Sequence, residues 1–225
     1  MTKLFKPYYP IAATVDVVIF TIEEDELKVL LIKRANDPHK NRWALPGGFL
    51  SQNEPTKNAA LRILKDKTGV KDVYLEQLYT FDTLGRDPRG HIITISYFAL
   101  VNPDATRLQK IEDLQTPTFF NIKKLPRLAF DHKTIIEYAK KRLAYKLEYT
   151  NAAFSLLPKK FTLTQLQNVY EIILDKKIDK RNFRKKYLSL DFIKPTHEKL
   201  KGIKQRPAEL YSFINKKPIE IQRFF

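Results

Sequence analysis

The segment GFLSQNEPTKNAALRILKDKTGV, residues 48–70, decides the fold that we expect for this chain. Its middle part, 55–68, has apolar residues at helical spacing, and Gly69 suits the left-handed conformation that commonly ends a helix. Gly47 and Gly48 stand before it and allow the backbone to turn or to approach another group closely. The segment therefore predicts a loop, a helix and a second loop. The apolar side of the predicted helix consists of Ala60, Leu61 and Leu64.

The sequence on both sides of this segment, up to residue 150, predicts a sheet and a second helix. The stretches rich in Val, Ile, Thr and aromatic residues are 11–20, 27–32, 74–83, 91–101 and 118–122, and we expect a strand in each. The acidic stretch 23–26 forms the expected tip of a hairpin. Asp131 can cap a helix that extends to about Tyr149. The apolar residues of that helix recur at intervals of four, at Ile135, Ala139, Leu143 and Leu147.

The last third of the chain has a different pattern. We expect a linker at 151–160, followed by a helix whose start carries a capping box formed by Thr162 and Gln165. Asp179 can cap a second helix. The apolar side of the second helix consists of Phe183, Tyr187 and Leu190, with Arg181, Arg184 and Lys185 on the opposite side. Two short strands, 192–193 and 210–213, enclose a basic loop, and this order of elements predicts a winged helix-turn-helix.

The basic residues are concentrated in this last third. The chain carries 41 basic and 25 acidic residues, a formal net charge of +16. Residues 151–225 hold 17 of the basic and 7 of the acidic residues. Such a basic module favours a polyanionic partner, either nucleic acid or an anionic membrane surface. A proteome rich in lysine would explain a basic chain, but it explains the C-terminal excess less well.

Composition also excludes several classes of protein. The absence of cysteine excludes a disulfide scaffold, a cysteine zinc site, an iron–sulfur cluster and a thiol nucleophile. The first residues contain no apolar stretch of the length of a signal peptide. No run approaches the ~18 apolar residues that a membrane span needs. We therefore expect a cytoplasmic protein that does not bind membranes.

The spacing within residues 48–70 resembles the Nudix box, a loop–helix–loop that binds metal and nucleoside-diphosphate substrates. The residues that carry this resemblance are Gly48, Glu54, Arg62, Leu64, Gly69 and Val70. The usual box has glutamates at three positions that are occupied here by Ile63, Asp66 and Lys67. Nudix hydrolases hold Mg²⁺ with these carboxylates, and Mg²⁺ prefers hard oxygen ligands. We therefore expect no metal, no cofactor and no efficient Mg²⁺-dependent hydrolysis.

Two positions of the box have simpler explanations than metal binding. Pro55 suits the first position of a helix, which would make Glu54 the cap or the partner of the helix dipole. Arg62 could form an internal salt bridge that holds the loop.

Four further stretches, residues 42–49, 86–90, 161–163 and 180–186, extend the resemblance over nearly the full chain. With them, the chain resembles the Nudix-related transcriptional regulators. This resemblance implies an α+β protein with a Nudix α/β/α sandwich at 1–150 and a winged helix-turn-helix domain at 151–225. In that family the Nudix domain is a sensor and the protein works as a homodimer. One branch represses genes of NAD metabolism and is loosened from DNA by ADP-ribose, and another branch senses a sugar such as arabinose. We expect the first of these, a repressor that senses ADP-ribose or a related nucleotide.

The resemblance and the chemistry of phosphate binding together predict the effector site. Arginine can donate two parallel hydrogen bonds to a phosphate, and glycine backbone N–H groups can approach its oxygens. The predicted ligand-binding residues are Arg34, Arg42, Gly47, Gly48, Phe49, Arg62, Arg86 and Arg89. Phe49 or Phe81 could stack on an adenine, although core packing is the simpler role for each. Trp43 and His132 are expected to serve packing.

The second helix of the basic module is expected to enter the major groove of double-stranded DNA. Arginine can recognise guanine and asparagine can recognise adenine through paired hydrogen bonds, while most lysines contact phosphates. The predicted DNA-binding residues are Lys180, Arg181, Asn182, Arg184, Lys185, Lys201, Lys204 and Arg206. A homodimer would require a near-palindromic operator. The alternative for this helix is a solvated basic face that contacts a protein.

Two other functions remain open. The chain could be a working hydrolase of compounds such as ADP-ribose, if metal ligands came from outside the box, for example from Glu76, Asp82 or Asp87. It could also be a sugar-sensing regulator of the same family. A turnover assay with Mg²⁺ or Mn²⁺ separates the hydrolase from both regulators.

Overall fold

The computed structural model describes residues 10–70, 73–103, 108, 116–200, 207–215 and 219. These residues belong to two compact units, each assembled from several segments of the chain. The first unit takes its residues from 1–19, 29–99 and 107–137, and the second from 20–28, 100–106 and 138–225. The domain boundary at residue 150 stays a prediction. In the described part of the chain, no helix is both long and apolar enough to cross a membrane.

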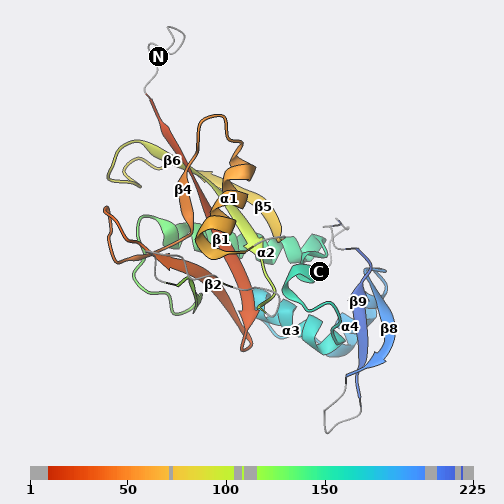
Figure 1. The fold of residues 1–225 in the computed structure, drawn as a ribbon. Coiled ribbons are helices and arrows are strands. Elements are labelled where there is room, and N and C mark those ends of the chain that lie inside the picture. Colours follow the sequence, from red (N-terminus) through yellow and green to blue (C-terminus); the bar gives the residue numbers. More distant parts are fainter. Residues whose placement is uncertain are drawn as a thin grey trace. The chain divides into compact units, whose positions relative to one another are not determined.

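A seven-stranded sheet is the framework of the first unit, and β1 (Ala12–Glu23) lies at its centre (Figure 1). The strand order is β3-β2-β1-β6-β5, while β4 pairs with β1 and β7 with β2. Residues 14–21 of β1 are all buried, and successive side chains of a strand point to opposite faces. Both faces of the sheet are therefore covered. The remaining strands are β2 (Glu26–Lys33), β3 (Trp43–Ala44), β4 (Gly47–Phe49), β5 (Tyr74–Phe81), β6 (Ile92–Leu100) and β7 (Thr118–Asn121).

Helix α1 (Thr56–Thr68) is the predicted helix of the 48–70 segment, and it packs beside β4 (Figure 1). It ends as expected at Gly69, which has φ = 75° and donates its N–H to the Lys65 carbonyl. Two details of the prediction were wrong. The N-cap is Pro55, so Glu54 does not cap the helix. Leu61 is 44% exposed, and the buried residues are Ala59, Ala60, Ile63, Leu64 and Thr68.

Helix α2 (His132–Tyr149) begins directly after Asp131, close to the predicted position. Its four apolar residues at intervals of four are all fully buried, as the spacing predicted: Ile135, Ala139, Leu143 and Leu147. The Asp131 carbonyl accepts the N–H of Ile135 at 3.2 Å and so starts the helical hydrogen-bond pattern.

The prediction of a linker at 151–160 was wrong for residues 152–156. Residues 152–156 form a short 3₁₀ helix, η3 (Ala152–Leu156), in which Ala152, Ala153 and Leu156 are buried. Within the second unit, α2 is therefore followed by a packed turn. This segment lacks the glycine and serine content of a flexible linker, and its apolar residues find partners.

The second unit contains the predicted helix pair, α3 (Leu163–Leu174) and α4 (Lys180–Leu188). The capping box of α3 is confirmed, because Gln165 N–H donates to Thr162 Oγ1 at 3.1 Å and Thr162 N–H donates to Gln165 Oε1 at 2.8 Å. Asp179 caps α4 by accepting the N–H of Asn182 at 2.8 Å.

The core between these helices is aromatic. Tyr170 of α3 lies 5.3 Å from Phe183 and 5.8 Å from Tyr187, between ring centroids, and all three side chains are fully buried. Leu190, the third apolar residue predicted for this side of α4, is only half-buried.

A two-stranded hairpin, β8 (Ile193–Lys199) and β9 (Glu209–Phe213), completes this unit next to α4 (Figure 1). Strand β8 is longer than predicted, so Lys194, His197 and Lys199 lie within the strand and not in the loop. Phe161 pairs with Tyr211 through two backbone hydrogen bonds and attaches the hairpin to the start of α3.

Candidate functional site

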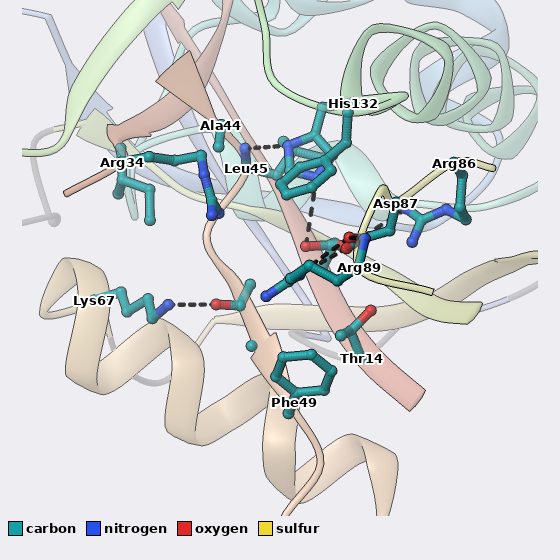
Figure 2. A pocket seen from close by; sticks show the side chains of 15 residues that line it. Thr14, Arg34, Ala44, Leu45, Phe49, Lys67, Arg86, Asp87, Arg89 and His132 are labelled. Atoms are coloured by element: carbon teal, nitrogen blue, oxygen red, sulfur yellow. Dashed lines mark hydrogen bonds and ion pairs between the residues drawn. The ribbon is translucent and has the colours of Figure 1, made fainter. Parts of the chain in front are cut away.

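A pocket lies entirely within the first unit, between α1, β4 and the loop around residues 86–89 (Figure 2). Its volume is about 680 Å³ when the open space at its mouth is included. Four cationic and two acidic side chains line it. The lining residues are Thr14, Asp16, Ile32, Arg34, Ala44, Leu45, Gly47, Gly48, Phe49, Lys67, Arg86, Asp87, Arg89, Phe130 and His132.

Arg86 connects the pocket to the start of α2. Its guanidinium donates two hydrogen bonds, of 2.9 and 2.7 Å, to the Asp131 carboxylate. It also lies 3.8 Å from the carboxylate of Asp16 on β1, and only 4% of its side chain is exposed. Arg86 is thus a buried cation shared by two carboxylates, one of which immediately precedes α2.

Arg89 and two aromatic rings form the mouth of the pocket. Arg89 is paired with Asp87 at 2.6 Å and lies over the rings of Phe49 and Phe130, at 5.0 and 5.7 Å from their centroids. Burial alone would raise the pKa of Asp87, but the hydrogen bonds and charge of Arg89 outweigh it and lower that pKa. Phe49 is 45% exposed, so its ring offers a stacking surface.

Phe130 also lies against a second cation, Arg34. Arg34 lies over the Phe130 ring at 4.7 Å, and its Nε donates to the Pro38 carbonyl at 2.7 Å. Burial and the nearby charge of Arg89 lower the pKa of Arg34. Phe130 has φ = 52°, an uncommon conformation for an aromatic residue. This unfavourable backbone places an aromatic ring within contact of two arginines at the pocket.

Lys67 enters the pocket from the last turn of α1, and its ammonium donates to the carbonyl of Gly47 (Figure 2). Burial lowers the pKa of Lys67, and Asp16 partly opposes this shift. Lys67 is therefore a half-buried cation beside Gly47, the first residue of β4.

His132, the first residue of α2, also faces the pocket. Its Nδ1 accepts the N–H of Leu45 at 2.9 Å, and its Nε2 lies 3.7 Å from Asp16. Burial lowers the pKa of His132, so the ring is neutral and carries its proton on Nε2. The sequence predicted that His132 packs at the start of the helix. In the structure it also lines the pocket.

The residues that could hold a metal ion are engaged otherwise. The Glu54 carboxylate accepts from Arg62 Nε and Nη2, both at 2.7 Å, and from the backbone N–H of Ser51 at 3.0 Å. Arg62 thereby holds the pKa of Glu54 at about 2. Among the described residues, no group of three His, Cys, Asp or Glu side chains is arranged to hold a metal.

The structure brings together most of the predicted ligand-binding residues. Six of the eight line the pocket: Arg34, Gly47, Gly48, Phe49, Arg86 and Arg89. Arg62 does not, because it forms the salt bridge with Glu54, the simpler of its two predicted roles. Arg42 does not line the pocket either, and its backbone pairs with Arg34. Phe81 lies outside the pocket against Tyr79.

Three polar residues of the pocket were not among the predicted ligand-binding residues: Asp16, Lys67 and Asp87. Asp16 lies in the predicted strand 11–20 and was given no role of its own. An acidic residue in an otherwise apolar strand is rarely buried without a partner, and this pattern could have indicated a functional site. Asp87 was considered only for a hydrolase, and Lys67 only as a lost metal ligand. Thr14 and Phe130 had no sequence signal that links them to this site.

Gly47 and Gly48 differ sharply in the space around them, which gives a test of the pocket geometry. A Cβ at Gly47 would overlap the carboxylate oxygen of Asp16 and lie 3.0 Å from the Val15 carbonyl, whereas at Gly48 the nearest atom is in Ile63 at 3.9 Å. We expect Gly47→Ala to reduce the free energy of unfolding by about 1–3 kcal/mol, measured by urea denaturation. Gly48→Ala is the matched control, and equal stability of the two variants would contradict this geometry.

The candidate DNA interface is the exposed side of α4. Lys180, Arg181, Asn182 and Lys185 are exposed there, as predicted. Arg184 differs, because it is half-buried and its Nη2 donates to Thr164 of α3 at 3.2 Å. The predicted contacts of the hairpin loop, Lys201, Lys204 and Arg206, lie outside the described residues. On β8, Lys194 and Lys199 are exposed.

Comparison with known proteins places both units in families. A model described as the NUDIX domain matches residues 12–139, and a model described as the NrtR DNA-binding winged helix domain matches residues 153–213. The "ADPR responsive transcriptional repressor NtrR" of Acinetobacter baylyi is 42% identical over 205 residues, covering 89% of this chain and 81% of the relative. The "ADP-ribose pyrophosphatase" of Methanocaldococcus jannaschii is 37% identical over 135 residues, 60% of this chain and 76% of the relative.

Solved structures of one regulator match as well. The structure of Shewanella oneidensis NrtR complexed with a 27mer DNA is 37% identical, with a TM-score of 0.80 over 89% of this chain and 93% of that one. The NUDIX domain of the same regulator complexed with ADP ribose is 37% identical, with a TM-score of 0.54 over 64% of this chain and 99% of that one. The chain belongs to the NrtR family of Nudix-related transcriptional regulators.

Proposed function

We propose that this chain represses transcription by binding DNA, and that ADP-ribose or a related nucleotide in its Nudix pocket weakens that binding. The observation that carries the proposal is the combination of a cationic pocket, in which Lys67 replaces a carboxylate of the Nudix box, with a basic, exposed α4. The named relatives supply the effector class, since one is called ADPR responsive and another was solved with ADP ribose. Their family implies genes of NAD metabolism as targets.

The pocket suits a nucleoside diphosphate. Arg34, Lys67, Arg86 and Arg89 give it four positive charges, and Asp16 and Asp87 give it two negative charges. The excess of positive charge matches a diphosphate, and arginine can bind phosphate through two parallel hydrogen bonds. The exposed ring of Phe49 at the mouth can stack on the adenine.

The same pocket is poorly equipped to cleave that diphosphate. Hydrolysis by a Nudix enzyme requires bound metal ions to stabilise charge while water attacks. Glu54 is held by Arg62, and Lys67 places an ammonium where a carboxylate would bind a dication. The protein therefore holds its effector without cleaving it.

DNA binding is assigned to α4. Arg181, Asn182 and Lys185 are exposed on the helix that follows the turn after α3, and the N-cap Asp179 fixes where that helix begins. Arginine and asparagine at such positions recognise guanine and adenine in the major groove, while lysines contact phosphates. Arg184 donates to Thr164 of α3, so it helps to position α4. A homodimer would bring two such helices to a near-palindromic operator.

Helix α2 is one of the elements that belong to both units, and it starts at the pocket. It begins with His132 in the pocket wall, and its residues from 138 onward belong to the second unit. An effector phosphate would compete with Asp131 for Arg86 and so change the contacts that fix the start of α2. An effector can act in this way only to the extent that it binds the two states with different affinity.

Hydrolysis of ADP-ribose is the second candidate function, favoured by the 37% identity to a pyrophosphatase and by the acidic residues Glu54 and Asp66 that remain in the box. A sugar-sensing regulator is the third. Asp66 is exposed and does not line the pocket, which weakens the case for hydrolysis.

One pair of assays separates these functions. We expect the protein to bind DNA from its own upstream region selectively over random DNA in fluorescence anisotropy, and to release no AMP from ADP-ribose with Mg²⁺ or Mn²⁺. Selective DNA binding without any response to ADP-ribose would move the effector search to sugars. Turnover of ADP-ribose without selective DNA binding would contradict the proposal and support the hydrolase.

A further inference from the structure

The Nudix box usually holds a divalent cation, so the fit of the present residues to such an ion can be tested. Both oxygens of Glu54 accept hydrogen bonds from Arg62, and one also accepts from Ser51 N–H. Ile63 is 1% exposed and offers no ligand atom. Lys67 brings a positive charge into the pocket. The residues present do not fit a divalent cation.

Lys67 instead puts an ammonium on the pocket floor. Its side chain runs from the last turn of α1 to the Gly47 carbonyl on β4, opposite the strand residue Asp16 (Figure 2). Because Lys67 anchors to a backbone carbonyl, the position of its charge is fixed before any ligand binds. A preorganised charge of this kind needs little rearrangement when an anion arrives.

The four cations of the pocket differ in their partners. Arg86 and Arg89 are paired with the carboxylates of Asp131 and Asp87. Arg34 and Lys67 donate only to carbonyls among the described residues. Carboxylates act on these two cations only from a distance, so their burial is compensated less than that of Arg86 and Arg89. Arg34 and Lys67 are therefore the two cations that gain most from an entering anion.

We propose that the Lys67 ammonium takes the place of the divalent cation of the Nudix box, so that this pocket binds the diphosphate of its effector without metal. This inference rests on the proposed sensor function and names the chemistry of that same site. Lys67 and Arg34 together supply two positive charges, as one divalent cation would. A lysine cannot activate water as a bound metal ion does, so the same substitution that removes hydrolysis retains the binding of the diphosphate.

The electrostatics of the pocket agree with this assignment. Burial lowers the pKa of Lys67, Asp16 partly opposes this shift, and the positive charge of Arg34 adds to it. Burial and the charge of Arg89 lower the pKa of Arg34, against the opposing charges of Asp87 and Asp16. The cations of the pocket repel one another, and a bound diphosphate would offset that repulsion.

Calorimetric titration with ADP-ribose tests the proposal on the full-length protein, in EDTA and in Mg²⁺. We expect the wild type to bind with the same affinity in both buffers. Lys67→Gln should weaken binding by about 10- to 100-fold in EDTA, as expected for the loss of a charged hydrogen-bond donor. Lys65→Gln is the matched control, because Lys65 is an exposed lysine on the same turn of α1 outside the pocket. It should bind as the wild type does.

The outcomes distinguish this inference from the sensor function itself. Binding that is lost in EDTA and restored by Mg²⁺, or wild-type affinity in Lys67→Gln, would overturn the role of Lys67 and leave the sensor function standing. Absence of ADP-ribose binding by the wild type in both buffers would overturn the sensor function and this inference with it. If a thermal melt shows that Lys67→Gln is poorly folded, the wild type in the two buffers still tests whether the pocket binds ADP-ribose without metal.

Discussion

Replacing Arg181 and Lys185 together with alanine is expected to reduce the affinity for operator DNA by about 30-fold or more. Both side chains are exposed on α4, away from the buried Phe183 and Tyr187, so the fold is retained. A side chain that contacts a base contributes about 1–3 kcal/mol to specific binding, and a phosphate contact contributes to binding on any sequence. Fluorescence anisotropy on operator and on random DNA measures both effects.

The control for this variant removes the same charge from another helix. Lys133→Ala with Lys141→Ala takes two positive charges from the exposed side of α2. We expect this pair to retain operator binding apart from the small effect of net charge. Equal losses in the two double variants would contradict the assignment of α4 as the DNA-binding helix.

Tyr170→Ala is expected to unfold the second unit and abolish DNA binding. Tyr170 is fully buried between Phe183 and Tyr187, so its removal leaves a large cavity in a small aromatic core. Truncation of a buried aromatic residue lowers the free energy of unfolding by about 3–5 kcal/mol, a large share of the ~5–15 kcal/mol of a typical domain. Near-ultraviolet circular dichroism during urea denaturation measures the loss.

Tyr145→Ala is the matched control, because Tyr145 is 51% exposed on α2. Its removal should change stability by no more than about 0.5 kcal/mol, as for most surface substitutions. ADP-ribose binding should survive in Tyr170→Ala, since every residue that lines the pocket belongs to the first unit. Loss of effector binding together with DNA binding would show that the first unit depends on the aromatic core of the second.

The elements of this fold were predictable where local chemistry decides them. Gly69 ended α1, Thr162 and Gln165 formed the capping box of α3, and Asp179 capped α4, because each depends on residues within one helical turn. The burial of Leu61 was predicted wrongly. Helical spacing identifies an apolar side of a helix, but it does not show which residues at the edge of that side pack against the sheet.

The pocket was predictable only in part, because it is assembled from segments far apart in the sequence. Arg34, Phe49 and Arg89 could be listed from phosphate chemistry and the family resemblance. That Arg62 would be held by Glu54, while Lys67 would reach the Gly47 carbonyl, depends on how α1 packs against β4. Likewise, the contact of Arg184 with Thr164 depends on the packing of α3 against α4. Contacts of this kind can be identified only when the tertiary structure is known.

The most direct test of an ADP-ribose-responsive repressor is a titration of ADP-ribose into the preformed complex of the protein with labelled operator DNA, followed by anisotropy. We predict that ADP-ribose releases the DNA, with a coupling of roughly 5- to 150-fold in affinity. Because such coupling is reciprocal, operator DNA must weaken ADP-ribose binding by the same factor. An operator affinity that stays constant while ADP-ribose saturates its pocket would contradict the central claim.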